Sequence, residues 1–171
     1  MSRKAILVGV VLLLSVSLAG ATTLVKMNFG DLARESDFIV IGTVTDIQGE
    51  WGPNHHFIHS NITIRVERAL NGTTGNQIVL RNPGGIVAGV GQRAEGVAEF
   101  EIGERVMLFL TTWEDGTLKV LGYTQGKSRV IVDGDGREHL VGGSANGLSV
   151  SGAELEIVHG PDHNIALRPA R

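Results

Sequence analysis

The sequence predicts a mainly all-β domain, built as a barrel or a sandwich rather than from alternating strands and helices. Short apolar, β-branched runs recur about every 8–12 residues, which is the strand spacing of such folds. Glycine, asparagine and aspartate separate the runs, and the chain holds 24 glycines against 4 prolines. These glycines show no three-residue period, so turns between strands explain them better than a collagen-like repeat.

The first 21 residues have the pattern of a cleavable signal peptide. Arg3 and Lys4 precede an apolar run that ends at Leu18, and Ala19 and Ala21 are small residues at the positions signal peptidase requires. The run is shorter than the ~20 residues needed to span a bilayer. We therefore expect a secreted or periplasmic protein without a transmembrane segment. The mature domain would occupy residues 22–141, followed by a glycine- and serine-rich, weakly structured segment over 142–171.

The first half of the domain should contain one helix and three strands. Residues 28–36 can form a short helix with Asn28 as its N-cap. Residues 38–45 form a continuous β-branched run, which predicts a central strand covered on both faces. After a loop at Gly52 and Pro53, residues 58–67 alternate apolar and polar side chains as a half-buried strand does. The turn signal Asn71-Gly72 then leads to a short strand over 77–81.

The second half should contain a wide loop, further strands and a hairpin. Residues 83–91 include four glycines and are expected to form the loop. An edge strand is expected over 97–100 and a covered strand over 105–110. Asp115-Gly116 is a hairpin turn that leads to a strand over 118–123. Residues 128–132 and 137–141 flank a second turn as a C-terminal hairpin, and a last strand is expected over 155–158.

The charge and the residue types present exclude several classes of function. The chain carries 15 Lys and Arg against 18 Asp and Glu, a net charge of −3, and no basic cluster. A nucleic-acid partner is therefore not expected, because such proteins neutralise phosphates with a basic surface. Cysteine is absent. Disulfides, thiolate nucleophiles, zinc-thiolate sites and a lipidated N-terminal cysteine are excluded on that ground.

His55, His56 and His59 form the only local histidine cluster. On an extended chain the side chains of residues 55 and 59 would project to the same side. No carboxylate follows at ligand spacing and there is no HExxH helix, so we expect loop histidines, no metal and no cofactor. No other motif indicates a catalytic residue. A metal-dependent enzyme that uses the three histidines remains an alternative, as does a passive envelope component.

Three segments resemble a known module. They are residues 32–44 (LARESDFIVIGTV), 69–72 (ALNG) and 100–110 (FEIGERVMLFL). In this order they are similar to the netrin-like module of tissue inhibitors of metalloproteases, in a cysteine-free form like that of uncharacterised secreted bacterial proteins. The resemblance implies an OB-fold-like, five-stranded Greek-key barrel with one short N-terminal helix, to which the C-terminal hairpin is added.

The resemblance also implies a non-enzymatic module that contacts a protein partner, for which an extracellular protease is one candidate. The metalloprotease inhibitors chelate the protease metal through an N-terminal cysteine, which this chain lacks, so metal-directed inhibition is not expected. The resemblance implies a position for the binding surface, because residues 86–90 would match the loop that lies beside the N-terminus in the inhibitors. The candidate partner-binding residues are therefore Ile86, Val87, Ala88, Gly89 and Val90. The alternative is that their aliphatic side chains fold back and close the end of the barrel.

Overall fold

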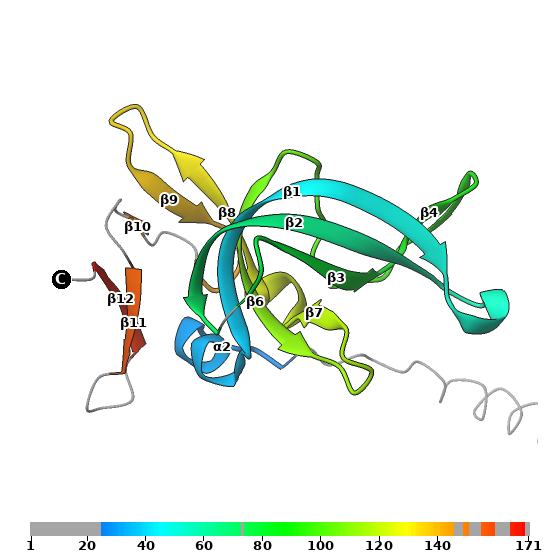
Figure 1. Ribbon diagram of the computed structural model, residues 1–171, viewed down its shortest axis with the longest axis horizontal. Coiled ribbons are helices and arrows are strands. Elements are labelled where there is room, and N and C mark those ends of the chain that lie inside the picture. Colours follow the sequence, from blue (N-terminus) through cyan, green and yellow to red (C-terminus); the bar gives the residue numbers. More distant parts are fainter. Residues whose placement is uncertain (1–24, 73, 146–148, 151–154, 160–164, 170–171) are drawn as a thin grey trace, which may run out of the picture.

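A closed ring of five strands forms the centre of the computed structural model (Figure 1). The structure describes residues 25–72, 74–145, 149–150, 155–159 and 165–169, so the predicted signal peptide over 1–21 lies outside the described residues. The ring strands are β1 (Phe38–Trp51), β2 (Ile58–Asn71), β3 (Gln77–Pro83), β6 (Arg105–Thr112) and β7 (Leu118–Val120). All predicted strands of the ring are present.

The order of the ring strands is β1-β2-β3-β7-β6, and β6 pairs with β1 to close it. The pair β3–β7 is parallel, with Leu80 opposite Leu118, and the other pairs are antiparallel. This is the pairing of a five-stranded Greek-key barrel of the OB type. The predicted fold class, an all-β OB-like barrel with one short N-terminal helix, is confirmed.

β6 and the first half of β1 are buried on both faces, as their continuous apolar runs predict. Because side chains alternate along a strand, each of these strands contributes to two cores. One core fills the barrel, and the other lies between the barrel wall, the helix and the C-terminal hairpin. The inward side chains include Val40, Val44, Val106, Leu108 and Leu110, and the outward ones are Ile39, Ile41, Met107 and Phe109.

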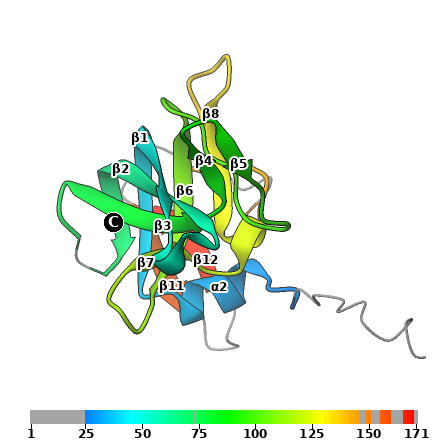
Figure 2. The ribbon, with the colours of Figure 1, turned by 90° about the vertical axis from the view of Figure 1, so that its right-hand side faces the viewer.

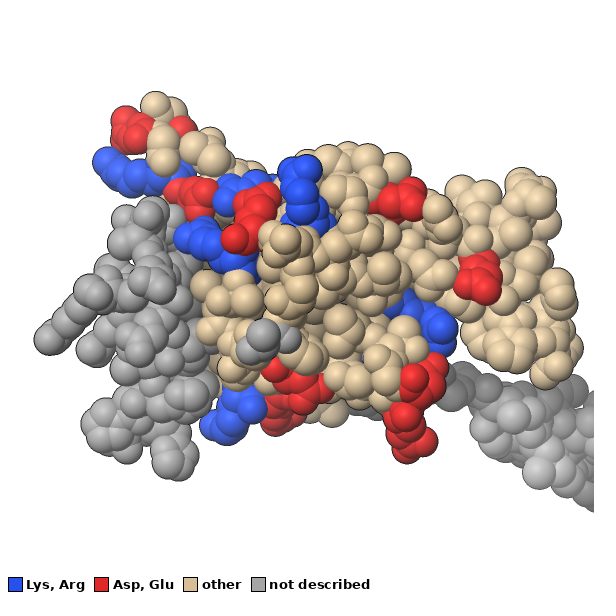
Figure 3. Space-filling view, viewed as in Figure 1, with Lys and Arg blue, Asp and Glu red and all other residues tan. Residues whose placement is uncertain are grey.

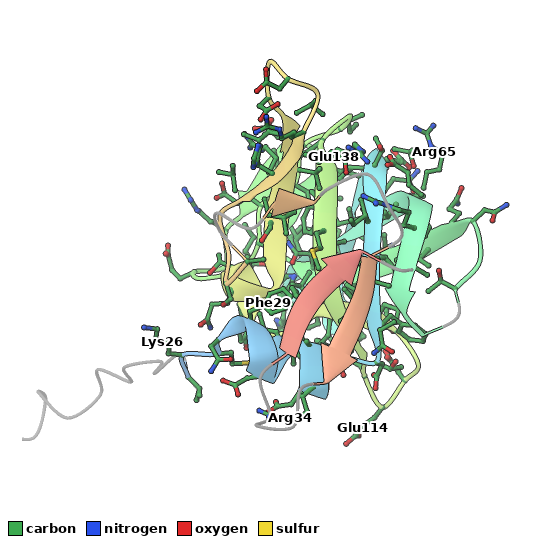
Figure 4. The ribbon with its side chains drawn as sticks, turned by 90° about the vertical axis from the view of Figure 1, so that its left-hand side faces the viewer. Lys26, Phe29, Arg34, Arg65, Glu114 and Glu138 are labelled. Atoms are coloured by element: carbon green, nitrogen blue, oxygen red, sulfur yellow. The ribbon has the colours of Figure 1, made fainter. Side chains whose placement is uncertain are left out.

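The short helix α2 (Phe29–Glu35) covers the outer core. Asn28 caps it, as predicted. The Asn28 side chain accepts a 2.9 Å hydrogen bond from the backbone N–H of Asp31. In return, the Asp31 carboxylate accepts a 3.2 Å hydrogen bond from the backbone N–H of Asn28. Leu32 is fully buried, and the Phe29 ring meets Phe109 edge-on with 5.5 Å between the ring centroids. In Figure 4 the labelled Phe29 lies on the side of α2 that faces the barrel.

Irregularities in the β1–β2 ladder bend these two long strands around the barrel. The register shifts at three places along β1, between Ile39 and Asp46. At Gly42 the strands approach so closely that a Cβ atom would lie 2.5 Å from the carbonyl oxygen of Arg65. Bulges and glycines are the usual means of curving a sheet enough to close a small barrel.

Further strands lie outside the ring. The predicted C-terminal hairpin is formed by β8 (Lys127–Val132), which pairs with β6, and β9 (Glu138–Val141). Within the segment 142–171, β10 (Ser149–Val150) pairs with β9, and β11 (Leu155–His159) pairs with β12 (Ile165–Pro169). β11 matches the last strand expected from the sequence. Figure 4 shows β11 and β12 beside α2 and the long strands of the barrel.

Two sequence predictions in the middle of the chain are wrong. Residues 83–91 do not form a wide loop, because β4 (Gly85–Val87) and β5 (Val90–Gln92) pair as a tight hairpin. Its two turn residues, Ala88 and Gly89, both have positive φ, at 49° and 82°, as a type I′ turn requires. Residues 97–100 form no strand, and the whole stretch 93–104 follows an irregular path.

Candidate functional site

The β4–β5 hairpin projects from one end of the barrel, next to the far ends of β1 and β2 (Figures 1 and 2). A Cβ atom at Gly49 of β1 would overlap the carbonyl oxygen of Ile86, so the hairpin rests directly on the β1 backbone. At its foot, Gly84 N–H donates to the Ile58 carbonyl at 2.9 Å, and Ser60 Oγ donates to the Gly84 carbonyl at 2.8 Å. These contacts fix the hairpin to the barrel.

The candidate partner-binding residues occupy this hairpin and its turn. Ile86 is 72% exposed and Val90 is 51% exposed, while Val87 is partly buried beside Gly49. Ala88 and Gly89 form the exposed tip. The side chains of Ile86 and Val90 therefore do not close the barrel end, which the sequence left as an alternative. They form an apolar surface on an ordered hairpin, and whether it binds a partner stays a prediction.

A groove runs along the foot of the hairpin. It has a volume of about 510 Å³ and lies between strands β1–β3 on one side and residues 92–101, most of them in the irregular stretch 93–104, on the other. Hydrogen bonds hold that segment in place: Asn82 Nδ2 donates to the Ala98 carbonyl at 2.8 Å, and Thr124 N–H donates to the Gly96 carbonyl at 3.2 Å. The groove thus has two walls fixed by the barrel and its connections.

An ion-pair cluster anchors the far end of the same segment. The Glu104 side chain is almost fully buried and accepts hydrogen bonds from Lys127 Nζ at 2.7 Å and from Arg129 Nε at 3.0 Å. Lys127 Nζ also donates to the Glu99 carbonyl, at the edge of the groove. Burial raises the pKa of Glu104, but the hydrogen bonds from Lys127 and Arg129 outweigh it, so the pKa lies below its ordinary value.

Two further cavities lie on the face of β2 and β3, towards the β6–β7 turn. The cavity of about 330 Å³ is bordered by Phe57, His59 and Arg81, and the one of about 350 Å³ by Tyr123. Trp113, at the β6–β7 turn, borders both. Sequence reasoning did not select the three aromatic residues Phe57, Trp113 and Tyr123. The available signal was their scarcity, since aromatic residues make up only 5% of the chain.

Two polar side chains in the wall of the smaller cavity carry enclosed atoms without a hydrogen-bond partner. The atoms are the two ring nitrogens of His59, a residue that is 6% exposed, and Nε of Arg81. The nearest charge to His59 is Glu50, whose Oε2 lies 3.5 Å from Nε2. Arg81 Nη1 donates to Asp115 Oδ2 at 3.0 Å. The pKa of Asp115 is lowered, mainly by hydrogen bonds from Thr117.

The three histidines do not converge. The sequence interpretation assumed an extended chain from residue 55 to residue 59, which is wrong: residues 53–55 form a 3₁₀ turn and β2 begins only at Ile58. His55 has a φ of 56°, and its ring lies beside that of Trp51, tilted by 39° with 5.7 Å between the centroids. His55 and His56 are exposed while His59 is buried. Within the described part of the chain, no three His, Asp or Glu side chains are grouped to hold a metal ion.

On the face shown in Figure 3, charged side chains gather over the β8–β9 side, and the end that carries β4 is mostly uncharged. Among the described residues, no helix combines the length and the apolarity needed to cross a membrane. No protein family, curated protein or solved structure matches the chain.

Proposed function

We propose that this protein is a secreted or periplasmic, non-enzymatic binding module that contacts a protein partner through the β4–β5 hairpin and the groove at its foot. The observation that carries the proposal is the exposure of Ile86 and Val90 on a hairpin that is fixed to the barrel. Apolar side chains that a rigid scaffold holds in solvent are typical of protein interaction sites.

The adjoining groove supports the same proposal. A protruding apolar hairpin can enter a concavity of a partner, while the groove of about 510 Å³ can accept a segment of that partner. The resemblance to netrin-like modules makes an extracellular protease the first class of partner to test. Because the chain has no cysteine, the proposed contact is an apolar one and does not involve the metal of a protease.

The test compares three forms of the mature protein, immobilised and exposed to the secreted and envelope fractions of its source. The first is the wild type, and the second carries Ile86→Ser and Val90→Ser. The control carries Ile131→Ser and Val132→Ser, which alters two similarly exposed aliphatic residues on β8, away from the hairpin. We expect at least one protein to be captured by the wild type and by the control and lost by the hairpin variant. Equal capture by all three forms would remove the hairpin from the proposal.

The proposed location has its own test. We expect the protein isolated from the secreted or periplasmic fraction to begin at Thr22, since Ala19 and Ala21 fit the cleavage pattern. N-terminal sequencing by mass spectrometry provides the measurement. A protein that retains Met1 and the following 20 residues would contradict the proposed secretion.

A further inference from the structure

Three exposed aromatic rings follow one another along the β2–β3 face of the barrel. Phe57 precedes β2, Trp113 lies at the β6–β7 turn and Tyr123 follows β7, and all three are about half exposed. The cavity between Phe57 and Trp113 and the cavity between Trp113 and Tyr123 share Trp113, Arg81 and Pro83. The two cavities therefore adjoin at these three residues, and we call them together the aromatic groove, which begins at the foot of the β4–β5 hairpin.

Among the described residues, the walls of the aromatic groove hold donors without a partner, besides the two ring nitrogens of His59. The indole N–H of Trp113 donates no hydrogen bond within the described residues, and Nε of Arg81 is enclosed without an acceptor. The nearby oxygen atoms are already engaged: Gln92 Oε1 accepts from Ile58 N–H, and the Asp115 carboxylate accepts from Arg81 and Thr117. An unsatisfied enclosed donor is costly, so a ligand acceptor towards which the side chain can turn would be favoured.

The charges along the groove do not call for an anionic ligand. Arg81 is paired with Asp115, and Arg93 is paired with Glu99 at 2.6 Å. Lys119 Nζ lies over the Trp113 ring, 5.1 Å from its centroid. Since the cations are neutralised or engaged in this way, a phosphate backbone would find no free basic stripe. An anionic ligand is therefore not favoured.

The backbone is strained at both ends of the aromatic groove. Asn54 and His55, in the β1–β2 connection, have φ values of 69° and 56°, and Tyr123 has a φ of 59°. A non-glycine residue in this region costs free energy and persists only where the surrounding structure fixes it. The surrounding structure therefore fixes the backbone just before Phe57 and at Tyr123.

We propose that the aromatic groove binds an extended, proline-rich segment of the partner. A polyproline II segment makes no internal hydrogen bonds, so its carbonyl groups are free to accept, and proline contributes no N–H donor. Its rings repeat with the helix period and pack into hollows between aromatic side chains. Apolar hollows on either side of Trp113, with donors in their walls, complement such a segment. This inference rests on the proposed function, because it names the chemistry of the partner.

The experiment titrates the mature protein with a decaproline peptide, followed by calorimetry. A Gly/Ser decamer, which has the same length but no rings, is the control peptide. The groove variants are Trp113→Ala and Tyr123→Asn; asparagine tolerates the positive φ of residue 123. The control variant is Ile131→Ala, with a side chain about as exposed as Trp113 but outside the groove. Melting temperatures establish that each variant is folded.

We expect saturable binding of decaproline to the wild type and to Ile131→Ala, and none of the Gly/Ser decamer. Each folded groove variant should bind decaproline at least about 10-fold more weakly, which corresponds to about 1.4 kcal/mol. Three results would overturn the proposal: no saturation with decaproline up to about 1 mM, equal binding of the two peptides, or unchanged affinity in both groove variants. Saturable binding of a neutral oligosaccharide such as cellohexaose, without peptide binding, would assign the groove to glycans instead. If decaproline fails while capture still depends on Ile86 and Val90, only this inference falls.

Discussion

Replacing Ile86 by alanine should have little effect on stability, because the side chain is 72% exposed. Complete burial of an isoleucine side chain contributes about 1.5–3 kcal/mol. The buried quarter of Ile86 therefore contributes less than about 1 kcal/mol, and for a protein of this length the melting temperature should fall by at most about 4 °C. Thermal and urea unfolding of the mature protein measure this directly.

Ile64→Ala is the matched control, because the same atoms are removed from a fully buried side chain of the barrel core. A core change of this kind costs about 2–5 kcal/mol. A loss above about 2 kcal/mol in Ile86→Ala, approaching that of Ile64→Ala, would show that the hairpin side chain supports the core. The reasoning that assigns the hairpin to a binding surface would then be refuted.

Three further predictions follow from the fold. The free energy of unfolding should decrease as the pH falls through and below 4.5, the ordinary pKa of glutamate. The reason is that the folded pKa of Glu104 lies below that value, so the unfolded chain binds more protons there. The urea midpoint of Glu104→Gln should depend less on pH, and an unchanged dependence would contradict this assignment. Asn28→Ala should lower the free energy of unfolding by about 1 kcal/mol through loss of the helix cap. Asn28→Ser should retain most of that free energy, since serine also caps helices. Equal unfolding midpoints for the wild type and both variants would disprove the capping role. Gly42→Ala should cost about 1–3 kcal/mol by overpacking against the Arg65 carbonyl, and a variant as stable as the wild type would show that β1 and β2 can separate there.

The barrel strands could be predicted because local patterns determine them. The continuous apolar runs over 38–45 and 105–110 indicated burial on both faces, and β1 and β6 are indeed shared by two cores. Asn28 could be identified as a helix cap from residue type and position alone. Strand lengths were less predictable, since β1 continues to Trp51 through polar residues that pair with β2. Pairing with a neighbouring strand, rather than apolar pattern, extends the strand there.

The candidate site was only partly predictable. The glycine-rich segment was selected, but its hairpin was missed, because Ala88 adopts a positive φ that is uncommon for alanine and gives no signal in the sequence. The aromatic groove was not predicted, because the scarcity of aromatic residues does not show which of them meet in space. Phe57 is far from Trp113 and Tyr123 in the chain, and the parallel β3–β7 pairing helps to bring their elements to one face. The extended geometry considered for residues 55–59 was wrong for a local reason, the 3₁₀ turn at residues 53–55.

Site-specific photo-crosslinking tests the central claim, that the β4–β5 hairpin contacts a protein partner, most directly. A photoreactive phenylalanine derivative placed at position 86 or 90 should give a crosslinked product of higher mass when cells or secreted fractions are irradiated. The same group at position 131, on the exposed face of β8, should give none. Crosslinks at 86 and 90 that identify one partner would support the account. Irradiated samples with no product at these two positions, or with the same product at 131, would contradict it.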